Sequence, residues 1–155
     1  MQGFSPAKLL LLGISVLIAA VAVAEILVRF GNAFPRAHPS LALSLAVIGI
    51  GAYAASWPIA SYRKAREKLE QAKRPNSFRA FRILVFARAT IITAVGFVGW
   101  FAGQLLWLLL FGNPVESLLF ATLLALGSST LMLLLGFLAE WNCRAPKDPD
   151  GEAKS

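Results

Sequence analysis

Four long apolar stretches constrain the fold of this chain more than any other feature. They run over about residues 9–28, 41–62, 83–111 and 117–142. About 20 helical residues cross the hydrocarbon core of a bilayer, so each stretch is long enough to span it. Because lipid offers no partners to backbone N–H and C=O groups, a spanning segment must satisfy them internally, as a helix does. The sequence therefore predicts an all-α, polytopic membrane protein: one domain with four transmembrane helices in a small antiparallel bundle. The connections between the stretches are short, which favours consecutive helices as antiparallel neighbours.

The composition favours lipid over water as the surroundings of this chain. Hydrophobic residues make up 57% of the 155 residues and charged residues 15%, whereas soluble domains average about 45–50% and about 25%. The single histidine, His38, and the single cysteine, Cys143, are predicted on opposite sides of the membrane. They provide neither an intramolecular disulfide nor a paired-cysteine zinc site. Since no nucleophile–base pair can be assembled either, we expect no cofactor, no metal and no enzymatic activity.

Lysine and arginine gather on one side of the predicted membrane. The opposite side carries only Arg29 and Arg36. Connections on the cytoplasmic side are enriched in these residues, so we expect a bacterial plasma-membrane protein with both termini in the cytoplasm and a flexible tail over residues 143–155. Apart from the basic loop described next, the cytoplasmic side holds four of these cations: Lys8, Arg144, Lys147 and Lys154.

The basic loop between the second and third spans holds eight cationic residues: Arg63, Lys64, Arg66, Lys68, Lys73, Arg74, Arg79 and Arg82. Ala65, Leu69 and Ala72 recur in it at helical spacing, which predicts that the second helix extends into the cytoplasm to about residue 73, before Pro75. This surface suits anionic lipid headgroups or an acidic partner, and the alternative is that the charges only fix the topology. We expect no nucleic-acid binding, because no recognition module fits into so short a loop.

The N-terminus allows a second interpretation. Lys8, the apolar run of residues 9–21 and the small-residue pattern Ala22-Val23-Ala24 resemble a secretory signal peptide with its cleavage site. Cleavage would leave three helices. The apolar run continues past that site to Val28, which favours a retained first helix, and the mass of the mature N-terminus distinguishes the two.

Three ionisable side chains lie inside or at the edge of the predicted helices: Glu25, Arg88 and Glu140. Charges in lipid usually face a partner or water. Arg88 and Glu140 fall at similar depths near the cytoplasmic ends of the third and fourth helices, so we expect them to pair, with separate snorkelling to the headgroups as the alternative. Glu25 precedes Arg29 in the favourable i,i+4 order, which predicts a locally neutralised carboxylate near the outer interface.

Small residues mark the expected packing faces of the helices. Gly99 and Gly103 form a GxxxG pattern in the third helix, and Gly96 lies on the adjoining face. Such residues let helix backbones approach closely. Trp107, in the same helix, is expected near the outer interface, where tryptophan gathers in membrane proteins.

The second half of the chain carries a family resemblance. The stretch FRILVFARAT, residues 81–90, followed by the three glycines, resembles the third-helix pattern of an uncharacterised actinobacterial membrane-protein family, domain of unknown function 3180. The ending AEWNCRAPKDPD, residues 139–150, is similar to the close of that family's fourth helix, with an acidic residue, a Cys-Arg-x-Pro stretch and an Asp-Pro-rich tail. The first two helices match in layout. The resemblance implies a retained first helix, no assigned activity, and one cytoplasmic-side cluster of Arg88, Glu140, Cys143 and Arg144.

Two functions of different classes remain open. The first is a non-enzymatic accessory or scaffold subunit of an envelope-associated membrane complex, which would contact a membrane-protein partner or a second copy through the third helix and the basic loop. The alternative is a small oligomeric four-helix transporter similar to multidrug exporters, which are built around a carboxylate deep in the first helix. Glu25 is the candidate carboxylate, but it lies about 10 Å from the midplane of the membrane by helix rise.

Overall fold

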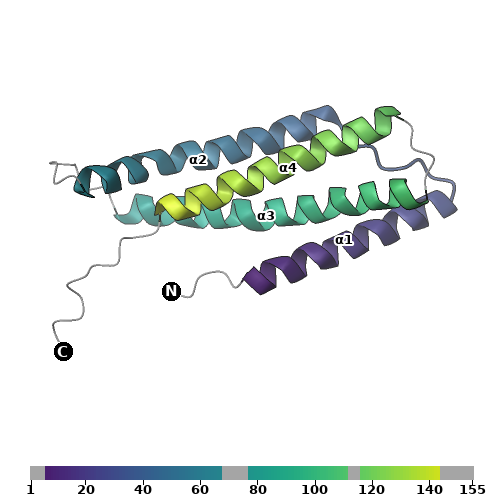
Figure 1. Ribbon diagram of the computed structural model, residues 1–155, viewed down its shortest axis with the longest axis horizontal. Coiled ribbons are helices and arrows are strands. Elements are labelled where there is room, and N and C mark those ends of the chain that lie inside the picture. Colours follow the sequence, from purple (N-terminus) through teal and green to yellow (C-terminus); the bar gives the residue numbers. More distant parts are fainter. Residues whose placement is uncertain (1–5, 68–76, 112–115, 144–155) are drawn as a thin grey trace.

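Four helices make up the fold in the part of the chain that the structure describes. This part of the computed structural model comprises residues 6–67, 77–111 and 116–143, without the side chains of residues 62–67, 77, 79 and 80. The helices are α1 (Pro6–Arg29), α2 (Pro39–Glu67), α3 (Ser77–Leu110) and α4 (Glu116–Cys143). Figure 1 shows the four helices side by side, with their axes roughly along the same direction.

Each helix is long and apolar enough to cross a membrane. The candidate spans are Pro6–Arg29, Pro39–Ser61, Phe81–Leu110 and Glu116–Cys143. The predicted all-α fold with four membrane-spanning helices is therefore confirmed, and the chain is a multi-pass membrane protein. The helix α2 continues past its span as far as Glu67; the remainder of the expected extension, to Lys73, lies outside the described residues, as does the tail over residues 144–155.

The helices alternate in direction, so α1 and α3 run parallel to each other and antiparallel to α2 and α4 (Figure 1). Helices α2, α3 and α4 all contact one another. Among the described helices, the backbone of α1 comes close only to the backbone of α3. The short first connection had favoured α1 and α2 as antiparallel neighbours, and in this point the expectation from the sequence was wrong. The connection instead crosses the end of α3, where Phe34 stacks on Trp107 with ring centroids 5.3 Å apart.

A glycine turn redirects the chain at the end of α1. Gly31 has a φ of 72°, a conformation that costs glycine little because it has no Cβ. The N–H groups of Gly31 and Asn32 bond back to the carbonyl oxygens of Val28 and Leu27, at 3.0 and 2.9 Å. These two bonds form a Schellman motif, which satisfies carbonyl groups at the helix end. The turn leaves Arg29 in the last helical turn and sends the connection toward α3.

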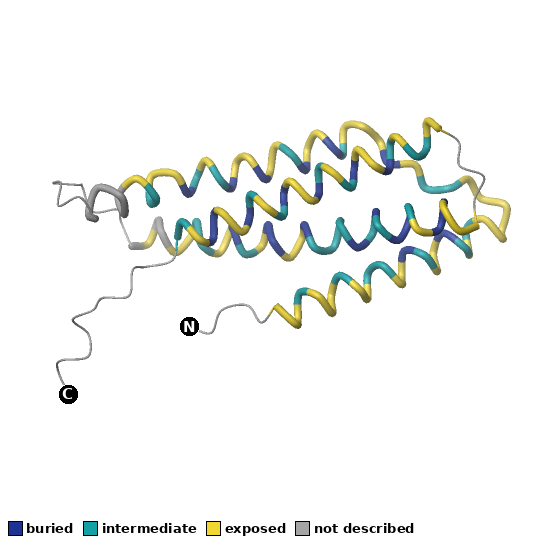
Figure 2. The backbone as a smooth tube through the Cα atoms, viewed as in Figure 1, coloured by how far each residue is buried: buried dark blue, intermediate teal, exposed yellow. Residues whose placement is uncertain are grey.

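Small side chains form part of the core between α2, α3 and α4. Ala52, Ala87 and Ala139, one from each helix, are fully buried together. A Cβ atom at Gly49 of α2 would lie 2.9 Å from the Cα atom of Met132 of α4. Without a hydrophobic force between helices in lipid, such close van der Waals packing holds them together. Figure 2 shows the buried residues along the inner faces of these helices, while α1 is mostly exposed.

Candidate functional site

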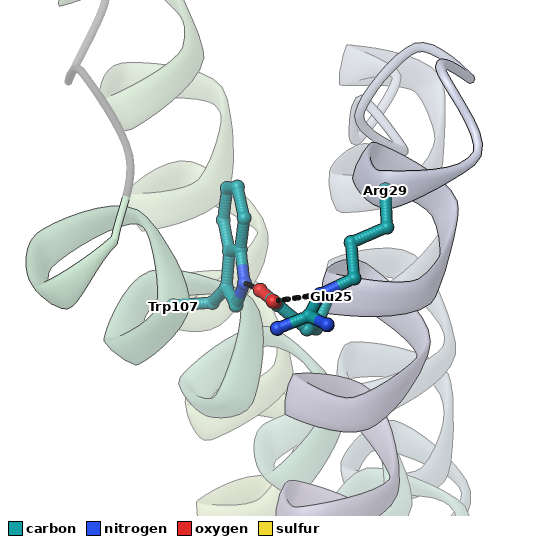
Figure 3. A network of polar contacts seen from close by, with 3 residues as sticks. All are labelled: Glu25, Arg29 and Trp107. Carbon is teal, nitrogen blue, oxygen red and sulfur yellow. Dashed lines mark hydrogen bonds and ion pairs between the residues drawn. The ribbon is translucent and has the colours of Figure 1, made fainter.

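The carboxylate of Glu25 lies at the centre of a polar cluster in the last turn of α1 (Figure 3). Arg29 Nε donates a hydrogen bond to Glu25 Oε1 at 2.6 Å, and Trp107 Nε1 donates one to Glu25 Oε2 at 2.9 Å. The four-residue spacing puts Glu25 and Arg29 on one face of α1, whereas Trp107 comes from α3. Both carboxylate oxygens therefore have a donor, and the cluster ties α1 to α3.

Trp107 is positioned by aromatic neighbours. Its side chain is buried, it stacks on the ring of Phe34, and the tilted ring of Phe111 has its centroid 6.5 Å away. From the sequence, Trp107 was expected only as an interface residue, and its bond to Glu25 was missed because the two residues are 82 positions apart. Two general rules point toward it: a buried indole N–H needs an acceptor, and a carboxylate in an apolar helix needs a partner.

An apolar groove opens beside this cluster. It has a volume of about 560 Å³, and both Glu25 and Arg29 contribute to its wall at one end. We call it the Glu25 groove. The rest of its wall is apolar or aromatic: Leu17, Ile18, Val21, Ala22, Leu106, Trp107 and Phe111. It therefore combines a long apolar wall with an exposed cation near the membrane surface.

A second ion pair lies toward the opposite end of the bundle. Arg88 Nε of α3 is 3.6 Å from Glu140 Oε1 of α4, which is the partnership expected from their depths. The Glu140 side chain is buried, with 6% of its surface exposed, while Arg88 keeps 29% of its side-chain surface exposed. Arg144, the third member of the predicted cluster, lies outside the described residues. Cys143 ends α4 and is partly buried.

A neutral hydrogen bond joins α2 to α4 near this ion pair. Asn142 Nδ2 donates to Ser56 Oγ at 3.2 Å, and Ser56 Oγ donates to the carbonyl oxygen of Tyr53 at 2.7 Å. This contact was not expected from the sequence. A serine and an asparagine in separate spans form no local pattern, so only their tertiary positions reveal it.

The basic loop falls largely outside the described side chains. Arg82 is the exception: its guanidinium lies over the ring of Phe78, 4.5 Å from the centroid. The backbones of Arg63, Lys64 and Arg66 are helical in α2, and that of Arg79 is helical in α3. Three further predicted residues lie outside the described chain: Lys68, Lys73 and Arg74. Lipid or partner binding by the loop thus stays a prediction.

The glycines of α3 divide into two groups. A Cβ atom at Gly99 would lie 2.5 Å from the carbonyl oxygen of Gly13, and one at Gly103 would lie 2.6 Å from that of Leu17. Real Cβ atoms do not come so close to backbone, so these two glycines let α1 pack on α3. A Cβ atom at Gly96 would meet nothing within 4 Å. Gly96 instead lines an open groove of about 440 Å³, the Gly96 groove, whose other lining residues are Val16, Thr93, Phe97 and Trp100.

Comparisons with known proteins identify a family for this chain but no function. A family described as a protein of unknown function, DUF3180, matches residues 9–147. The searches of curated proteins and of solved structures found no match. The matched region covers all four spans almost completely, from the first turns of α1 to just beyond α4. The chain belongs to the DUF3180 family of proteins of unknown function.

Proposed function

We propose that this protein is a non-enzymatic accessory subunit of the plasma membrane, which binds one transmembrane helix of a larger envelope-associated complex in the Gly96 groove. The observation that carries the proposal is the position of Gly96. At Gly99 and Gly103 the backbone of α1 occupies the space that a side chain would fill, but at Gly96 the corresponding space is open. The uncovered glycine leaves backbone accessible to a further helix, in the way that small residues do at helix interfaces in lipid.

The walls of the Gly96 groove suit a helix that carries a large apolar side chain. Phe97 and Trp100 flank the glycine, while Thr93 brings a hydroxyl to the same groove. An apolar knob can enter above Gly96 and pack between the two rings, since aromatic side chains provide much contact area. Val16 closes the groove from α1, so the docked helix would contact both members of the α1–α3 pair.

The distribution of charge supports cytoplasmic termini. Because the helices alternate in direction, the start of α1, the end of α2, the start of α3 and the end of α4 lie toward one end of the bundle (Figure 1). Lys8, Arg82 and the helical positions Arg63, Lys64 and Arg66 belong to that end, whereas Arg29 and Arg36 belong to the other. The positive-inside rule then assigns the first end to the cytoplasm.

Proton-coupled transport through Glu25 is less well supported by the site. Both oxygens of its carboxylate accept hydrogen bonds, from Arg29 and Trp107. Its salt bridge with Arg29 is formed within one helix turn, at the end of the span. A carboxylate that is already paired near the membrane surface is well suited to attach α1 to α3. It is less suited to take up and release a proton.

Affinity purification of the tagged full-length protein from its native membrane, in mild detergent, tests the accessory role. We expect one membrane-protein partner at stoichiometric yield, and a photo-crosslinking residue in place of Thr93 should attach to it. Gly96→Leu should lower the recovered partner by about tenfold, since a filled groove excludes the packed anchor of an interface. Gly127→Leu is the matched control, because an added Cβ atom at Gly127 of α4, like one at Gly96, would meet nothing within 4 Å.

Three results would contradict this role. The first is a purification that yields no stoichiometric partner. The second is a crosslink from position 93 to another copy of the chain, which would make the protein a homo-oligomer. The third is equal loss of the partner in Gly96→Leu and Gly127→Leu, which would place the contact elsewhere.

A further inference from the structure

The Glu25 groove has the form of a lipid site, and it lies at the end of the bundle opposite to the basic loop. We propose that it binds a single glycerophospholipid, with the phosphodiester on the guanidinium of Arg29 and an acyl chain along the apolar wall. This inference goes beyond the accessory role, because it concerns a different groove and a different class of ligand.

The wall of the groove follows the axis of α1 from the membrane interior to its surface. Its α1 residues begin at Leu17 and end at Arg29, a rise of about 18 Å along the helix. Between these ends the α1 wall is built from Ile18, Val21 and Ala22, with Glu25 near the surface. An acyl chain that runs parallel to the helix can bury its methylene groups along this wall and leave its headgroup at the level of Arg29.

The guanidinium of Arg29 is available to a headgroup. The hydrogen bond that the structure gives it uses only Nε, which donates to Glu25, and its side chain is 78% exposed. Arginine carries five N–H donors in a planar fork, so the edge formed by the terminal nitrogens can bind two phosphate oxygens. Such bidentate, charge-assisted bonds are the strong ones in phosphate recognition.

The surroundings hold Arg29 ready for that contact. Glu25 orients the guanidinium, Trp107 fixes Glu25 from α3, and Phe34 stacks on Trp107 from the connection. A side chain held in its bound geometry loses less entropy when a ligand arrives. Because Glu25 neutralises the net charge of the pair, directed hydrogen bonds, more than long-range attraction, would hold the phosphate. A lysine at this position should therefore bind more weakly than arginine.

Native mass spectrometry of the full-length protein in detergent, titrated with phosphatidylglycerol, tests the site. We expect one lipid to bind before all others, and Arg29→Gln to weaken this first binding by about tenfold, as the loss of a hydrogen bond to a charged group does. Arg29→Lys should fall between the two. The matched control is Arg36→Gln, which removes an exposed arginine of the connection after α1 that does not line the groove and should leave the first binding nearly unchanged.

A second pair of variants tests the apolar wall and does not depend on the polar cluster. Ala22→Phe should fill the groove and weaken the first lipid, whereas Ala19→Phe, at an exposed position of α1 outside the groove, should not. This pair decides the matter if Arg29→Gln does not fold.

Three outcomes would overturn the inference. Arg29→Gln and Arg36→Gln could weaken the first lipid equally, which would indicate general surface charge. A phosphate-free diacylglycerol with the same acyl chains could bind as tightly as phosphatidylglycerol, which would remove the role of the phosphodiester. Finally, Ala22→Phe could bind the lipid as well as Ala19→Phe does, which would place the acyl chain outside the groove.

Discussion

The two interfaces of α3, one with α1 and one with α4, use similar chemistry with different consequences. Each combines close backbone contacts at small residues with an acidic side chain. In the α3–α4 interface the acid is Glu140, which is buried, and its cation Arg88 comes from the other helix. In the α1–α3 interface the acid is Glu25, which is 37% exposed, and its cation Arg29 comes from the same helix.

This difference shows which of the two ion pairs depends on the packing of separate helices. The local pair of Glu25 and Arg29 can form in α1 alone, so within this polar cluster only the bond from Trp107 joins α1 to α3. The pair of Arg88 and Glu140 exists only when α3 and α4 are packed. We therefore expect the α3–α4 interface to be essential to the bundle and the α1–α3 interface to open more readily.

The largest effect is expected for Glu140→Leu. Removing one partner of a buried ion pair typically costs about 3–5 kcal/mol, because the other charge loses its compensation. The variant should unfold at lower denaturant concentration, measured by circular dichroism in detergent. The double variant Arg88→Leu/Glu140→Leu should recover much of the loss, since an apolar pair needs no such compensation. A double variant no more stable than Glu140→Leu would show that the charges do not act as a pair.

Gly103→Leu should come next, and it should open the α1–α3 interface while the other three helices stay packed. The added side chain would meet the carbonyl oxygen of Leu17 and the Cβ atom of Ala20, neither of which can move aside easily. Overpacking of this kind costs about 1–3 kcal/mol.

A disulfide reporter can measure this opening. The pair Gly13→Cys and Val95→Cys, placed in Cys143→Ser protein, brings two thiols together only when α1 is seated, because a Cβ atom at Gly13 lies 3.4 Å from Val95 Cγ1. Crosslinking should drop in Gly103→Leu and persist in Gly51→Leu, whose added Cβ atom would meet nothing within 4 Å. Unchanged crosslinking in Gly103→Leu would refute the role given to the glycine.

Trp107→Phe should loosen the same interface to a lesser degree. Phenylalanine can keep the stack on Phe34 but cannot donate the hydrogen bond to Glu25, so the tie between the helices is lost while the aromatic packing remains. The same disulfide reporter should form more slowly than in the parent protein. The control is Trp57→Phe, at an exposed position of α2. Equal rates in the two variants would mean that the indole N–H does not help to seat α1.

Asn142→Ala should have the smallest effect. It removes the donor to Ser56 Oγ, and hydrogen bonds between membrane helices average about 0.6 kcal/mol. Chemical denaturation should detect a slight loss of stability, far below that of Glu140→Leu. A loss of comparable size would indicate that the α2–α4 contact, rather than the ion pair, holds this end of the bundle.

Much of the fold could be predicted from local sequence. Runs of apolar residues long enough to cross a bilayer identify the helices, because a helix lets a single segment in lipid satisfy its own backbone polar groups. The pairing of Arg88 with Glu140 could also be anticipated, since depth in the membrane is a one-dimensional coordinate that sequence position provides. The pairing of Glu25 with Arg29 could be anticipated as well, because the two residues are one helical turn apart.

The neighbours of each helix could not be predicted in this way. Connection length suggested that α1 would lie beside α2, yet α1 packs on α3. The glycines of α3 predicted that another helix would pack closely on their face, but they did not predict which helix. That choice depends on how side chains from distant segments fit together, which no local pattern encodes.

The number of membrane spans, four, can be read from local sequence, because span length and hydropathy are properties of single segments. Only the packing of distant segments brings Trp107 to Glu25, places α1 against Gly99 and Gly103, and leaves Gly96 open. Both proposed binding grooves result from this packing, because a groove exists only between helices and its shape depends on which helices meet and how closely.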